Sequence, residues 1–189
     1  ERELRMRKIS VLLGVLMVAL AGSAAAQTGS LGYYPIEEMG IFTDGDLEVD
    51  IDLSGAMIQV AAGAVENQDE GLADLVATLE RVRVQVGEPS GVDAAGVARR
   101  MADAKTKLEG AGWHKIISVE ESTEQIYLYA LERDGRISGL TGFVNEAGEE
   151  VVIINIVGDV DPRTLGRVLA HLGGVNFEEI MAGMEGLEQ

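Results

Sequence analysis

The chain has 189 residues, of which 47% are hydrophobic and 25% are charged, which is the balance of a folded protein rather than a disordered one. Its 32 acidic residues outnumber its 15 basic residues, and the formal net charge of −17 would repel a phosphate backbone, so nucleic acid is not an expected partner. Cysteine is absent, which excludes disulfides, thiolate metal sites and a cysteine nucleophile.

The first segment has the pattern of a secretory signal peptide. Residues 6–8 are a methionine, a plausible initiator, followed by two basic residues. An apolar run over 9–22 comes next, and then an Ala-x-Ala cleavage site at 24–26. The run is shorter than the ~20 residues that a transmembrane helix needs. We therefore expect residues 1–26 to be removed, and a periplasmic or secreted protein that begins at Gln27, without a lipid anchor or membrane insertion.

Residues 27–189 are expected to form a single domain, with its core over about 31–173. The first element is a short helix within 31–42. A strict alternation of apolar and acidic residues over 47–53 then predicts a strand with one buried and one wet face. Apolar residues at helical spacing follow in two segments, separated by the polar residues 67–70 and extending to Leu79.

The next two elements are a strand and a helix. Alternation over 81–86 predicts a strand whose inward residues are Val82, Val84 and Val86. Asp93 is a suitable N-cap for a helix with apolar residues at helical spacing. The glycines Gly110 and Gly112 end this helix.

The second half of the chain is predicted to be mostly strand. Four strands are expected, over 116–120, 125–132, 136–144 and 150–157. Asp134-Gly135 is a hairpin turn signal, and the nearly continuous apolar run 151–157 is typical of a central strand covered on both faces. Asp161-Pro162 then begins a helix. Its expected buried stripe is Leu165, Val168, Leu169 and Leu172.

The element order β-α-β-α-β-β-β-β-α predicts an α+β domain. Hairpins between neighbouring strands and helices at two crossovers indicate a mixed, mostly antiparallel sheet, with helices packed mainly on one face. The second face of the central strand then needs another cover. A terminal segment such as 31–42, or a second copy of the protein, could provide it.

Four short stretches in the second half carry a resemblance to a known family. They are Ala111-Gly-Trp-His-Lys-Ile-Ile117, Gln125-Ile-Tyr-Leu-Tyr129, Arg136-Ile-Ser-Gly-Leu-Thr141 and Asn155-Ile-Val-Gly-Asp-Val-Asp-Pro162. In this order and spacing they resemble the uncharacterised bacterial family filed as domain of unknown function 4252, over roughly 31–173. The resemblance implies a small exported α/β module, and it brings no established activity, cofactor or catalytic residue.

Two acidic stretches are candidates for binding a metal ion. The first, 44–52, places Glu48, Asp50 and Asp52 at alternate positions, and Ca²⁺ takes oxygen ligands. The stretch lacks the ligand order of an EF-hand, so we favour a solvated strand face that prevents edge-to-edge aggregation. In the second stretch, Asp161 is interpreted as an N-cap and Asp159 as a turn former. No metal ligand is predicted.

Catalytic chemistry has few candidates in this sequence. His114 and His171 are the only side chains with an ordinary pKa near neutral pH. No Gly-x-Ser-x-Gly elbow is present, and the glycines of 137–142 lie within a predicted strand, where they indicate a bulge or close packing rather than a phosphate loop. We therefore predict no catalytic or cofactor-binding residue and no cofactor.

Aromatic residues offer one further candidate, a binding groove lined by Trp113, Tyr33 and Tyr34. Aromatic residues make up only 4% of the chain, so we expect its single tryptophan to pack in the core instead. These observations together favour a non-enzymatic, exported module that contacts an unknown protein partner, or a second copy of itself, in the envelope. The alternatives are a periplasmic protein that binds Ca²⁺ or a small ligand and, less favoured, a hydrolase that uses a pair of carboxylates.

Overall fold

The structure is a computed structural model that describes residues 30–43, 45–65, 70–121, 124–146 and 149–164. The elements are η1 (Ile36–Met39), β1 (Leu47–Ser54), α2 (Ala56–Val65), α3 (Glu70–Ala77), β2 (Leu79–Gly87), α4 (Ala94–Gly110), β3 (His114–Glu120), β4 (Gln125–Arg133), β5 (Arg136–Glu146) and β6 (Glu150–Val160). This is the α+β order that the sequence predicts. Residues 162–164 are helical, and the expected stripe of the last helix lies outside the described residues.

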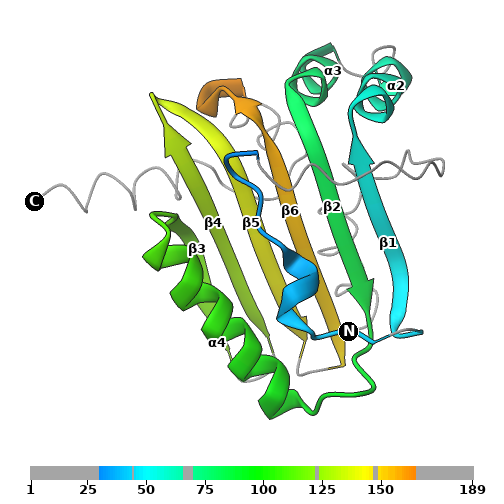
Figure 1. The fold of residues 1–189 in the computed structure, drawn as a ribbon, viewed down its shortest axis with the longest axis vertical. Coiled ribbons are helices and arrows are strands. Elements are labelled where there is room, and N and C mark those ends of the chain that lie inside the picture. Colours follow the sequence, from blue (N-terminus) through cyan, green and yellow to red (C-terminus); the bar gives the residue numbers. More distant parts are fainter. Residues whose placement is uncertain (1–29, 44, 66–69, 122–123, 147–148, 165–189) are drawn as a thin grey trace, which may run out of the picture.

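The six strands form one sheet in the order β1-β2-β6-β5-β4-β3 (Figure 1). Every described pair is antiparallel. The nearly continuous apolar run of β6 therefore occupies a central position, between β2 and β5, as predicted. Strands β1 and β3 are the two edges of the sheet.

One face of the sheet, which we call the α4 face, carries α4 and the segment 30–42 (Figure 1). The buried side of α4 packs against Tyr127, Tyr129 and Phe143, and the apolar residues of η1 join the same cluster. The proposal that 31–42 covers the second face is therefore wrong. The segment is held on the α4 face because the inward-facing Asn155 of β6 binds its backbone.

The opposite face is lined by aliphatic side chains on all six strands, and we call it the aliphatic face. One residue per strand illustrates its course from edge to edge: Ile51, Val84, Ile154, Val144, Ile126 and Val119. Helices α2 and α3 lie at one end of this face, next to the ends of β1 and β2 (Figure 1). None of the helices that the structure describes is long and apolar enough to cross a membrane.

Local sequence signals account for the ends of several elements. Asp93 accepts a hydrogen bond from the Gly96 N–H at 2.8 Å, which is the predicted N-cap of α4. Asp134 and Gly135 both have positive φ, 52° and 74°, as a two-residue type I′ hairpin between β4 and β5 requires. The second helical segment ends earlier than predicted, because Leu79 begins β2 instead.

Candidate functional site

The aliphatic face is the first candidate for a binding surface. Its residues toward the β3–β5 side are half-buried rather than buried, including Ile126, Leu128 and Val144, and so is Ile154 on the central strand. Over the middle of the sheet the positions of this face are aliphatic or glycine, whereas Glu146 and Glu150 pair on it at one end and His114 pairs with Ala130 at the other. A continuous apolar surface of this kind is costly to leave in water.

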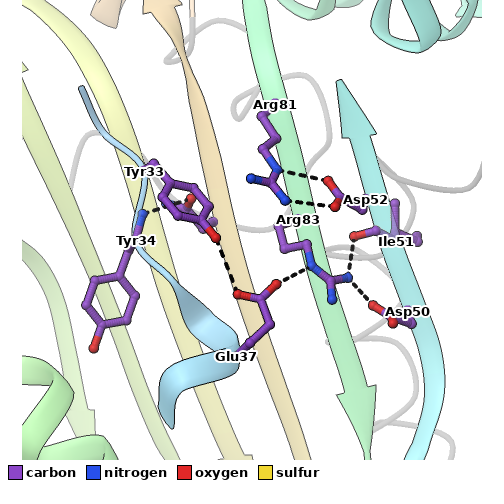
Figure 2. Close-up of polar contacts among 9 residues, drawn as sticks. Tyr33, Tyr34, Glu37, Asp50, Ile51, Asp52, Arg81 and Arg83 are labelled. Carbon is purple, nitrogen blue, oxygen red and sulfur yellow. Dashed lines mark hydrogen bonds and ion pairs between the residues drawn. The ribbon is translucent and has the colours of Figure 1, made fainter. Parts of the chain in front are cut away.

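The second candidate is an arginine–carboxylate layer on the α4 face, composed of Glu37, Asp50, Asp52, Arg81 and Arg83 (Figure 2). Arg81 binds Asp52 with two parallel hydrogen bonds, from Nε at 2.9 Å and from Nη2 at 2.8 Å. Arg83 donates from Nε to Glu37 at 2.6 Å and from Nη1 to Asp50. The layer therefore connects the edge strand β1, strand β2 and η1.

Tyr33 closes the layer from the side of the 30–42 segment. Its ring lies over the Arg81 guanidinium, 4.8 Å from carbon Cζ to the ring centroid, and its hydroxyl donates to Glu37 at 3.4 Å (Figure 2). The hydrogen bonds with Asp52 raise the pKa of Arg81. The Arg81 Nη1 atom is buried without a hydrogen-bond partner among the described residues. Both arginines are about 90% buried at the side chain and already bound to carboxylates, so the layer is best described as a structural clamp.

These contacts revise the expectation for the first acidic stretch. Asp50 and Asp52 lie on the edge strand, as expected, but they are ion-paired with Arg83 and Arg81 rather than simply solvated. The signal that sequence reasoning missed is the alternation of arginines on β2, which matches the alternation of aspartates on β1. Among the described residues, no group of three or more histidine, aspartate or glutamate side chains could hold a metal ion.

Asp46 organises the turn that leads into β1. It accepts hydrogen bonds from the Ser90 hydroxyl, and from the Thr43 N–H and the Thr43 hydroxyl at 2.7 Å each. These donors favour the ionised carboxylate and lower the pKa of Asp46 to about 2. The role of Asp46 is to hold the loop before β1 against the loop after β2.

The second acidic stretch is divided between a strand and a helix start. Asp159 lies within β6 and pairs with Arg136 of β5, so its predicted role as a turn former is wrong. Asp161 accepts the Arg163 N–H at 2.7 Å, as a residue at the start of a helix does. Pairing across the β5–β6 ladder accounts for Asp159 without a metal ion.

A third group of carboxylates gathers at the other end of the sheet. The pKa of Glu150 is raised by burial and by the negative charges of Glu146, Glu48 and Glu88. Glu146 is its direct partner across the β5–β6 ladder, and the Glu150 Oε1 atom is buried without a hydrogen-bond partner among the described residues. Burial and the neighbouring negative charges therefore disfavour the ionised form of Glu150.

The other predicted candidates are two histidines and three aromatic residues. His114 is exposed at the start of β3, and His171 lies outside the described residues. Trp113 is buried in the core cluster, as expected. Tyr33 and Tyr34 lie on the 30–42 segment, where Tyr34 packs edge-on against Phe143 with 6.3 Å between ring centroids. Trp113 belongs to the core cluster against which Tyr34 packs, so these two aromatic residues have a packing role.

The glycines of 137–142 have the predicted close-packing role at one position. A Cβ atom on Gly139 would lie 2.5 Å from the Gly32 Cα atom and 2.7 Å from the Trp113 ring. Strand β5 also has a register irregularity between Ile137 and Gly139. The glycine thus lets the 30–34 backbone lie directly against the strand.

Comparison with known proteins gives one match. The profile of the family described as Domain of unknown function (DUF4252) matches residues 42–168, which is more than half of the chain and includes all six strands. Neither the curated proteins nor the solved structures gave a match. The protein belongs to the DUF4252 family.

Proposed function

We propose that this protein is an exported, non-enzymatic domain that binds a protein partner through its aliphatic face. The observation that carries the proposal is the uncharged, half-buried strip of aliphatic residues that crosses β6, β5, β4 and β3. Contiguous apolar patches larger than a few hundred Å² mark interaction sites on otherwise polar proteins.

The geometry of the sheet favours a partner of substantial size. Six strands spaced ~4.8 Å apart give a sheet about 24 Å wide. The described helices of this face lie at one end only (Figure 1). A surface of this width suits an apolar helix or a second sheet, both of which pack on sheet faces. A small polar ligand would leave most of it in water.

The acidic excess of the chain bears on which partners it can bind. The net charge of −17 disfavours anionic membrane surfaces and acidic proteins, and it favours a partner whose rim is basic. Export is supported by the signal-peptide pattern of residues 1–26. Intact-mass measurement of the secreted protein is expected to give a chain that begins at Gln27, and a retained leader would contradict export.

Affinity capture with a matched pair of variants tests the interaction. Leu128→Gln places an amide on the aliphatic face, whereas Ser118→Gln places the same side chain at an exposed position of β3 whose register partner is Tyr127 of the α4 face. Captured from its own envelope, the wild-type protein and Ser118→Gln should retain the same discrete partner, and Leu128→Gln should lose it. Equal retention by both variants, at equal melting temperatures, would exclude this face as the contact.

A further inference from the structure

No further inference is drawn: the strongest candidate, the strip of half-buried aliphatic residues on β3, β4 and β5 with Glu146 and Glu150 at one end, belongs to the site already described, and nothing in the part of the chain that the structure describes shows what covers it.

Discussion

At the scale of single residues, Asn155 shows how a polar group is accommodated in the central strand. Its side chain has no exposed surface. The Nδ2 atom donates toward the Gly32 carbonyl, the Leu140 carbonyl and the Thr141 hydroxyl at 2.9–3.2 Å, and Oδ1 accepts the Tyr34 N–H at 3.2 Å. An unsatisfied amide at this position would cost ~1–3 kcal/mol, so Asn155 fixes the 30–34 backbone to the sheet.

Arg83 is the residue of the arginine–carboxylate layer whose loss should matter most. Arg83→Met removes the contacts with Glu37 and Asp50 and with the Ile51 carbonyl. We expect the free energy of unfolding to fall by ~1–3 kcal/mol, the range for losing hydrogen bonds to charged groups. Arg99→Met removes the same charge from an exposed position of α4, and it should change the free energy of unfolding by less than ~0.5 kcal/mol. Equal effects in urea unfolding would show that net charge, and not the clamp, is responsible.

Glu150 is expected to destabilise the protein at neutral pH. Its raised pKa means that the folded state disfavours the ionised form, so its unfavourable contribution is present above the folded pKa and vanishes below the ordinary value of 4.5. Glu150→Gln should therefore raise the melting temperature at pH 7. At pH 4 the two proteins should melt together. The exposed Glu149→Gln is the control, and a stabilisation that persisted at pH 4 would contradict this explanation.

At the scale of elements, the contact between β5 and the 30–34 segment depends on close backbone packing. Gly139→Ala would place a methyl group 2.5 Å from the Gly32 Cα atom and 2.7 Å from the Trp113 ring, so the segment or the ring must move. We expect a loss of ~1–3 kcal/mol and a change in tryptophan fluorescence. Gly142, in the same strand, has its nearest neighbour at 3.6 Å, so Gly142→Ala should be neutral or mildly stabilising. Similar losses for both would mean that strand glycines matter here for reasons other than contact.

At the scale of the whole molecule, periodicity predicted most of the sheet. The alternation of β1 and β2, the continuous apolar run of β6 and the Asp134-Gly135 turn each determine a local geometry, so the strands and their central member followed from the sequence. The N-cap at Asp93 was equally local. Each of these signals depends only on residues that are close together in the sequence, so the sequence alone predicts the strands, the turn and the N-cap.

The candidate site was harder to predict because it joins residues that are distant in the sequence. Arg83 meets Glu37 across 46 positions, and Asn155 meets Gly32 across 123. No periodic pattern indicates that β2 lies beside both β1 and β6, or that 30–42 lies on the α4 face. The alternation in β1 identified its wet side correctly, but only the fold shows that arginines occupy the neighbouring strand.

For the whole molecule, our central proposal is that a protein partner binds the aliphatic face. The most direct measurement is photo-crosslinking in living cells, with a photoreactive amino acid at Leu128 and, as a control, at the exposed Ser118 of the neighbouring strand. We predict that the Leu128 probe gives an adduct of one reproducible mass with another protein, and that the Ser118 probe does not. An adduct of the same mass from Ser118 and none from Leu128 would place the contact elsewhere and contradict the account.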